Sequence, residues 1–250
     1  MARHAQPDWE PGGRAVDHPE LSGHGRLQAE ALAEALASER FDHCYTSTLE
    51  RAVETAEFVT RRTGLRFQQC AWLDELRLPP LEGQTAEQVE RFFADARARD
   101  LEKWWDGAPG GESFRHLYER VVTGLEELLE GAHGVRSHDN SGYRLWRPPE
   151  ADLRILIVAH EGSNAIILSR LLDVEPVPWA FVRFSSYWAA ISRVATVAVA
   201  DAWAFTLRSF NDWEHLRALG LPPGGGERRP HRLQRPALLA AGAETNQHRQ

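Results

Sequence analysis

Ile155-Leu156-Ile157-Val158-Ala159-His160-Glu161-Gly162 is the stretch on which the fold depends. An apolar run rich in β-branched residues leads to a histidine and a glycine, and a segment with apolar residues at helical spacing follows. This order is typical of a buried parallel strand, a turn and a helix. It places His160 at the carboxyl end of the strand, where open α/β sheets bind ligands.

A second histidine stands in the first residues, Met1-Ala2-Arg3-His4-Ala5-Gln6. The pair Arg3-His4 puts a permanently charged, fork-shaped donor beside an imidazole that is neutral and nucleophilic near pH 7. Such a pair suits attack on a phosphoryl group. We therefore expect His4 and His160 to meet at one edge of the sheet.

Length and composition limit the classes of protein. The chain has 250 residues, 42% of them hydrophobic, which is enough to bury a substantial core. We expect one α/β domain over residues 1–221. The Pro- and Gly-rich run that begins at Pro222 and the Arg-rich remainder predict a disordered tail over residues 222–250.

Charge and cysteine content argue against several partners. The net charge is -7, and the absence of a Lys/Arg block outside the tail argues against a nucleic-acid partner. Cys44 and Cys70 lack a CxxC spacing, and no apolar run approaches the roughly 18 residues of a membrane span. The sequence thus predicts a cytoplasmic protein without disulfides, a thiolate zinc site or a membrane span. It leaves the oligomeric state open.

The remaining elements follow from periodicity and turn signals. Helices are expected from Ser22 to about Ser38, with Ser22 as N-cap, and from Ser47 to about Arg62, where Glu50 completes a capping box. We also expect strands at 41–45 and 65–70 and two cap helices at 85–99 and 112–130. An insertion loop over 131–152 is expected to include a short hairpin around Tyr143 to Trp146, and 191–199 and 203–207 are expected to form an edge hairpin.

Phosphoryl transfer to a histidine requires a neutral imidazole, cationic donors around the phosphate and an acid for the departing oxygen. His4 is the candidate nucleophile, and Arg3 and Arg51 are candidate phosphate clamps. His160 is a second phosphate donor, and Glu75 is the candidate acid. Asp74 and Glu82 are rivals to Glu75, although a surface carboxylate is the default interpretation of either.

Five motifs occur in an order that resembles the histidine phosphatase superfamily, the phosphoglycerate-mutase-like group. They are Arg3-His4-Ala5, Leu21-Ser22-Gly23-His24-Gly25 with Gln28-Ala29, Ser47-Thr48-Leu49-Glu50-Arg51-Ala52-Val53-Glu54-Thr55-Ala56, Leu73-Asp74-Glu75 with Glu82-Gly83, and Val158-Ala159-His160-Glu161-Gly162. The resemblance extends from Arg3 to about Leu172. Each motif alone is weak, but the five in order are specific.

The resemblance implies a three-layer αβα sandwich with a mostly parallel sheet and a helical cap insertion. It also implies that His4 is transiently phosphorylated, that Arg3, Arg51 and His160 hold the phosphate, and that Glu75 transfers the proton. The substrate would be a small phosphomonoester. No cofactor and no metal are implied.

The chain departs from the family pattern at three places. Only Met1 and Ala2 precede Arg3, where the family has a strand of several apolar residues, so the first strand is either vestigial or the chain starts late. Pro7-Asp8-Trp9 stands near the position of a frequent Asn, and Glu161 stands where many members have Gly. A short strand predicts weaker support for His4, because a free terminus holds geometry less well than a regular element.

Several residues keep a second interpretation. Trp104 and Trp105 line a substrate entrance or cap the core below the helical insertion. The other histidines that we considered lack a ligand-like spacing, which argues against a metal site and favours solvent exposure; they are His18, His24, His43, His116 and His133.

Three functions remain open at this point. The first is a phosphatase that works through phosphohistidine at His4. The second is a phosphoglycerate mutase-type transfer, but the Trp-Asn and Gly-Trp signatures that are typical of mutases are missing here. The third is a catalytically weak phosphate-binding module, which the short first strand would favour.

Overall fold

The computed structural model describes residues 1–221 apart from residues 141, 148 and 150. The predicted tail lies outside the described residues, and the boundary at residue 221 stays a prediction. The strands are β1 (Ala2–Arg3), β2 (His43–Thr46), β3 (Phe67–Gln69), β4 (Arg136–Asn140), β5 (Tyr143–Arg147), β6 (Ile155–Ala159), β7 (Ile191–Val199) and β8 (Ala202–Asp212). The helices are α1 (Gly23–Leu36), α2 (Glu50–Thr63), α3 (Ala86–Arg97), α4 (Phe114–Glu126), α5 (Glu161–Leu171), α6 (Ala180–Arg183) and α7 (Glu214–Ala218).

The described strands form one mixed sheet in the order β3-β2-β6-β1-β7-β8-β5-β4. The half from β3 to β1 is parallel. The half from β1 to β4 is antiparallel. The prediction of an α/β fold is confirmed, but the prediction of a mostly parallel sheet is wrong, because the two hairpins β7–β8 and β4–β5 extend the sheet beyond β1.

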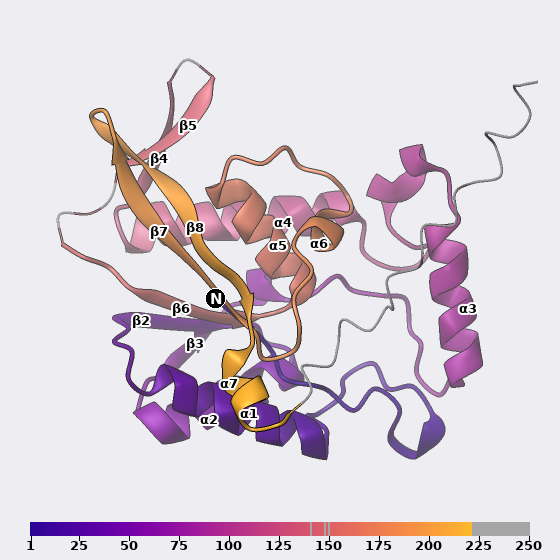
Figure 1. Cartoon of the computed structure of the whole chain (residues 1–250). Helices are drawn as coiled ribbons and strands as arrows, with labels where there is room; N and C mark the ends of the chain where they lie inside the picture. The colour runs from indigo at the N-terminus through magenta and orange to yellow at the C-terminus, as the bar shows by residue number, and fades with distance from the viewer. Residues whose placement is uncertain (141, 148, 150, 222–250) are drawn as a thin grey trace, which may run out of the picture.

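The position of the β7–β8 hairpin also differs from the prediction. It was expected at a sheet edge, but β7 pairs with the central strand β1, and β8 is followed by β5. The segment predicted as an insertion loop with a short hairpin around Tyr143 to Trp146 contains a longer antiparallel hairpin, β4 and β5, which supplies the two outer strands of the sheet. Figure 1 shows this hairpin beyond β7 and β8.

Helices lie on both sides of the parallel half, because successive side chains of a strand point to opposite faces. Leu156 and Val158 of β6 belong to a core with α1, α2 and α7. Ile157 and Ala159 of β6 belong to a second core with α4 and α5. In Figure 1, α1, α2 and α7 lie below the sheet and α4 and α5 lie above it.

The two helices predicted as a cap differ from each other. Helix α4 packs in the second core through Leu117, Val121 and Leu125, so it belongs to the body of the domain. Helix α3 contributes no buried residue and lies away from the sheet (Figure 1). Trp104 and Trp105 pack edge-on against Trp179 and Tyr118, which supports their interpretation as residues that cover the core.

Of the two helix caps predicted at Ser22 and Ser47, the structure has the first and lacks the second. Ser22 is the N-cap of α1, and its side chain accepts a hydrogen bond from the amide of Gly25 at 3.0 Å. The capping box at Ser47 is wrong. Helix α2 begins at Glu50, with Leu49 as the N-cap residue and no side-chain cap, while the Ser47 hydroxyl donates to Asp74 and accepts from the amide of Leu49.

Candidate active site

The two predicted histidines follow paired strands. Strands β1 and β6 are parallel, with Arg3 opposite Ala159, so the next residues, His4 and His160, leave the sheet at the same edge. Their ring centroids lie 5.0 Å apart at an interplanar angle of 56°. The structure therefore brings together residues that are separated by more than half of the chain.

His4 is held in one protonation state. Its side chain is buried, and Nδ1 lies 2.7 Å from the carbonyl oxygen of Ala5. Because a carbonyl oxygen only accepts, Nδ1 carries the hydrogen and Nε2 holds the lone pair of the neutral ring. Burial, then the charges of Arg51 and Arg3, lower the pKa of His4 well below 6.5, so the ring is neutral at pH 7.

His160 is fixed by a chain of hydrogen bonds. Its Nε2 lies 2.7 Å from the hydroxyl of Ser47, which donates to a carboxylate oxygen of Asp74 at 2.7 Å. Since the Ser47 proton goes to Asp74, the Ser47 oxygen accepts from Nε2–H of His160. Burial, followed by the charge of Arg51, also lowers the pKa of His160 well below 6.5. Asp74, which was a rival of Glu75 as the acid, therefore accepts a hydrogen bond from Ser47 and orients His160 through it.

Arg3 and Arg51 reach the same place from two elements. Arg3 ends β1, and Arg51 stands in the first turn of α2, where the free amides of a helix also favour anions. Burial lowers the pKa of Arg51 to about 10, against the opposing charge of Glu75, so the guanidinium stays protonated at neutral pH. Nε of Arg3, Nε of Arg51 and Nδ1 of His160 are buried without a hydrogen-bond partner within the described residues.

Glu75 lies on the loop that follows β3 and contacts the start of α5. Its carboxylate accepts a hydrogen bond from the amide of Gly162 at 2.9 Å. A Cβ atom at Gly162 would collide with Glu75 Oε1, so this approach requires glycine in the His160-Glu161-Gly162 motif. Glu82, the other rival, is exposed and accepts from the amide of Asp17 instead.

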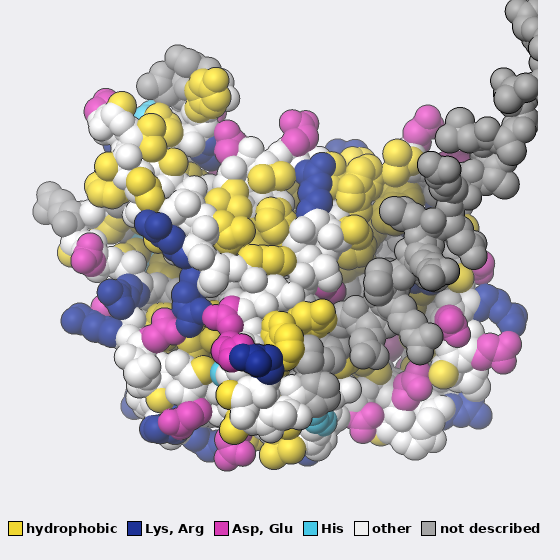
Figure 2. All heavy atoms as spheres, in the orientation of Figure 1, with side chains coloured by type: hydrophobic (Ala, Val, Ile, Leu, Met, Phe, Trp, Pro, Cys, Tyr) yellow, Lys and Arg dark blue, Asp and Glu magenta, His cyan; other side chains and the backbone are white. Residues whose placement is uncertain are grey.

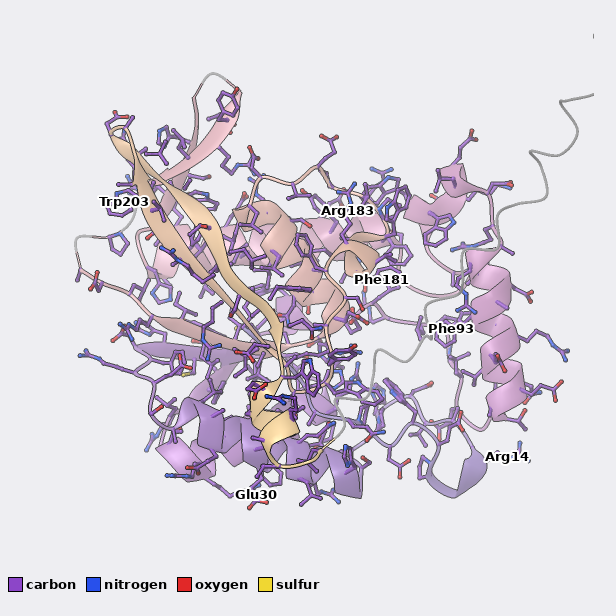
Figure 3. All side chains as sticks on the ribbon, in the orientation of Figure 1. Arg14, Glu30, Phe93, Phe181, Arg183 and Trp203 are labelled. Atoms are coloured by element: carbon purple, nitrogen blue, oxygen red, sulfur yellow. The ribbon has the colours of Figure 1, made fainter. Side chains whose placement is uncertain are left out.

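A cavity of about 830 Å³ opens at this cluster. Arg3, Arg51 and Glu75 line it, whereas His4 and His160 are 3% and 0% exposed and lie next to these residues. Figure 3 shows the region between α3 and α6, where Phe93 and Phe181 are labelled. An anion in the cavity would therefore meet Arg3 and Arg51, whose charges also act on the buried His4.

Sequence reasoning missed four contacts around Arg3, Arg51 and Glu161. Glu161 forms an ion pair with Arg3 at 3.3 Å and accepts a hydrogen bond from Ser185 at 2.7 Å. Arg3 also donates to the backbone oxygen of Ser186. The guanidinium of Arg51 lies 4.9 Å from the ring centroid of Trp9, a cation–π contact. Glu161 and Trp9 stood out only as departures from the family pattern, which was the available signal.

The part of the chain that the structure describes comprises residues 1–221 apart from residues 141, 148 and 150. There, no group of three His, Cys, Asp or Glu side chains is arranged to hold a metal ion. Within the same residues, no helix has the length and apolar character needed to cross a bilayer. Cys44 and Cys70 are free thiols.

Known proteins share this fold and sequence pattern. Glucosyl-3-phosphoglycerate phosphatase of Mycobacterium tuberculosis is 29% identical over 200 residues, which cover 76% of this chain and 85% of that protein. A solved mycobacterial glucosyl-3-phosphoglycerate phosphatase in complex with VO3 superposes with a TM-score of 0.64 at 27% identity, covering 85% of this chain and 97% of that one.

Other relatives are matched over part of their length. Phosphoserine phosphatase 1 of Hydrogenobacter thermophilus is 33% identical over 131 residues, which cover 51% of this chain and 62% of that protein. The 6-phosphofructo-2-kinase/fructose-2,6-bisphosphatase of Gallus gallus is 27% identical over 73% of this chain, but the match covers 34% of that protein. The chain thus spans about a third of the length of the longer relative.

The match to a protein-family model covers the parallel half of the sheet and most of the antiparallel half. The model of the histidine phosphatase superfamily (branch 1) matches residues 1–206, which contain all the site residues described above. With its two histidines meeting at the ends of β1 and β6, the chain belongs to the histidine phosphatase superfamily.

Proposed function

We propose that this chain hydrolyses a small phosphomonoester through a phosphohistidine intermediate on His4. The observation that carries the proposal is the state of His4, which is a buried neutral imidazole with its lone pair on Nε2, flanked by two arginines. A nucleophile of this kind beside fixed positive charge is suited to phosphoryl transfer. The phosphatase names of the relatives support the same chemistry.

In the first step, the lone pair on Nε2 of His4 attacks phosphorus while the bond to the alcohol oxygen breaks. Arg3 and Arg51 hold the equatorial oxygens, and their unpartnered buried Nε atoms support this role. Glu75 donates its proton to the departing oxygen. The products are phosphohistidine and a neutral alcohol.

In the second step, water attacks phosphorus and the bond to Nε2 breaks. Glu75, now a carboxylate, accepts a proton from the water and returns to the acid form. His160 is held in place by Ser47 and Asp74, and because its Nε2–H is given to Ser47 it donates to phosphate through Nδ1 only when the negative charge of a bound phosphate protonates the ring. The cycle needs no group beyond the side chains of this chain and water.

Replacing His4 with Ala tests the proposal. We expect the loss of aryl phosphate hydrolysis together with the loss of acid-labile phosphate on the protein, because both depend on Nε2. The matched control is His43→Gln, which alters an exposed histidine that does not line the cavity. Hydrolysis by the His4→Ala variant at the parent rate would remove His4 from the mechanism.

The substrate class, the location and the partners of the protein are predicted less specifically than the reaction. The small phosphorylated substrate agrees with the names of the relatives. The cytoplasmic location rests on the free thiols of Cys44 and Cys70, and it stays a prediction together with the absence of a nucleic-acid partner.

A further inference from the structure

The cavity at the proposed active site is larger than a phosphate group needs. Its volume of about 830 Å³ lies near the upper end of the roughly 300–1,000 Å³ that is usual for small-molecule sites. It is continuous from Arg3 and Arg51 to Phe93 on α3 and Phe181 on α6. The part beyond the arginines is therefore available to the alcohol part of the substrate.

The walls of this outer part are mostly apolar. Leu76 and Leu78 come from the loop after β3, Phe93 comes from α3, and Phe181 and Val182 come from α6. Leu78 and Val182 are 37% and 60% exposed, so both can be covered by a ligand in the cavity. In Figure 2, hydrophobic side chains gather over α5 and α6 on this face.

Helix α3 presents its apolar side to the same space. Thr85 caps it, and the helix has an amphipathic sequence, yet it buries no residue against the domain. Val89 and Phe93, one turn apart, line the cavity. Figure 3 shows Phe93 on the side of α3 that is turned toward the body of the molecule. An apolar group in the cavity would cover this face of α3.

The charges of the cavity argue against a second anionic group on the substrate. Arg3 and Arg51 stand at the proposed phosphate position, and Arg77 faces Glu112 at 3.7 Å. The lining also contains the carboxylates of Glu10 and Asp17. A substrate carboxylate or second phosphate would meet negative charge there, which costs binding free energy.

We propose that the substrate is a phosphomonoester of a bulky, apolar, uncharged alcohol, with its apolar part seated between α3 and α6. This inference rests on the proposed function and names its substrate class. Three features of the cavity support this substrate class. The cavity is continuous with the proposed phosphate position, apolar residues of α3 and α6 line it, and the carboxylates of Glu10 and Asp17 also lie in its lining.

Three alkyl phosphates with leaving groups of similar basicity test the substrate class, namely hexyl phosphate, glycerol 1-phosphate and 3-phosphoglycerate. Burial of one methylene favours binding by about fourfold. We expect kcat/KM for hexyl phosphate to exceed that for glycerol 1-phosphate by more than about tenfold. We expect 3-phosphoglycerate, which carries a second anionic group, to be the poorest of the three.

Phe93→Ser tests the location, because α3 buries no residue and the substitution leaves the core intact. The readout is the ratio of kcat/KM for hexyl phosphate to that for glycerol 1-phosphate. We expect this ratio to fall at least about fivefold, as the loss of one or two buried methylene contacts would produce. Leu101→Ser is the matched control, since Leu101 is 62% exposed and does not line the cavity; its ratio should equal that of the parent.

The outcomes separate this inference from the proposed function. Hydrolysis in which glycerol 1-phosphate or 3-phosphoglycerate is preferred would overturn the substrate class and leave the phosphatase activity standing. A preference for hexyl phosphate that Phe93→Ser does not reduce would overturn the seat between α3 and α6. Failure to hydrolyse any phosphomonoester, aryl phosphates included, would overturn the proposed function and this inference with it.

Discussion

Helices α5 and α3 border the same cavity but are held in different ways. In α5, nine of eleven residues are buried, and its first residues contact Arg3 and Glu75. In α3, none of twelve residues is buried. The side chains proposed to act in catalysis are therefore held by the buried helix α5. The side chains proposed to bind the apolar part of the substrate lie on α3, where substitutions should have little effect on the stability of the fold. Changes beside α5 should slow all substrates, and changes on α3 should discriminate among them.

The largest effect that tests the core side is expected at Glu75. Glu75→Gln keeps the shape and can still accept from Gly162, but it cannot donate a proton to the departing oxygen. We expect a loss of about 100- to 10,000-fold in kcat on an alkyl phosphate, as is typical of general acid catalysis, and a far smaller loss on an aryl phosphate with a good leaving group.

Steady-state kinetics on the two substrates measures this difference. The control is Glu82→Gln, which changes an exposed carboxylate on the same loop and should retain the parent rates. Equal losses on both substrates in Glu75→Gln would assign Glu75 to structure alone.

Arg51 also tests the buried side of the cavity, because it is buried and its charge acts on His4. Removal of one clamp on the transferring phosphate costs about 2.7–4 kcal/mol if it resembles the loss of one oxyanion donor. Arg51→Lys retains charge but loses the planar fork, so we expect a loss smaller than that limit but clear in kcat/KM for every substrate. Arg61→Lys, on the exposed side of the same helix, should match the parent. A fully active Arg51→Lys variant would contradict bidentate binding.

Stability should fall in mild acid because of the two buried histidines. The pKa values of His4 and His160 are lowered in the folded state, so below pH 6.5 the unfolded chain binds protons that the folded chain does not. Their contribution is fully present above pH 6.5 and is lost as the pH falls. We expect the free energy of unfolding to decrease by up to about 1.4 kcal/mol per pH unit for each group.

Urea denaturation between pH 5 and pH 7.5 measures this slope. His160→Gln should reduce the slope, although it lowers stability at every pH by removing the bond to Ser47. An unaltered slope in His160→Gln would exclude His160 as a source of the acid sensitivity.

The smallest effects compare two helix caps. Ser22 caps α1, which lies in the core, and Thr85 caps α3, which buries nothing. Loss of a cap costs about 1 kcal/mol of helix stability. We expect Ser22→Ala to lower Tm by about 2–4 °C, whereas Thr85→Ala should leave Tm nearly unchanged because α3 can unfold locally. Calorimetry checks both. A Tm loss in Thr85→Ala equal to that in Ser22→Ala would show that α3 is coupled to the core.

The sequence predicted strands β2 and β6 of the parallel half well, because each is followed closely by a helix. It could not place the β7–β8 hairpin, since alternation predicts a hairpin but not the strand beside which it docks. The segment Arg136–Asn140 is polar and has no alternation, so its strand conformation comes from pairing with β5 and not from local preference.

The candidate site residues were predicted from their chemistry and from the order of the family motifs, and only for His160 did the end of a strand add a positional argument. Arg3, His4, Arg51, Glu75 and His160 all lie in one cluster. The contacts Glu161–Arg3 and Ser47–His160 were not predicted, because they join side chains that are far apart in the sequence and leave no periodic signal.

Strand β1 has only two residues but lies between β6 and β7 in the sheet. This position determines how fast its backbone amide hydrogens exchange with solvent. The amide of Arg3 donates to Ala190 at 3.1 Å, and the amide of His4 donates to Ala159 at 2.9 Å. Such amides exchange their hydrogens for deuterium only when neighbouring strands separate. The amide of His4 should therefore exchange as slowly as those of β6, unlike a fraying terminus. The lifetime of the geometry around His4 is then set by the rate at which the sheet opens between β6 and β7.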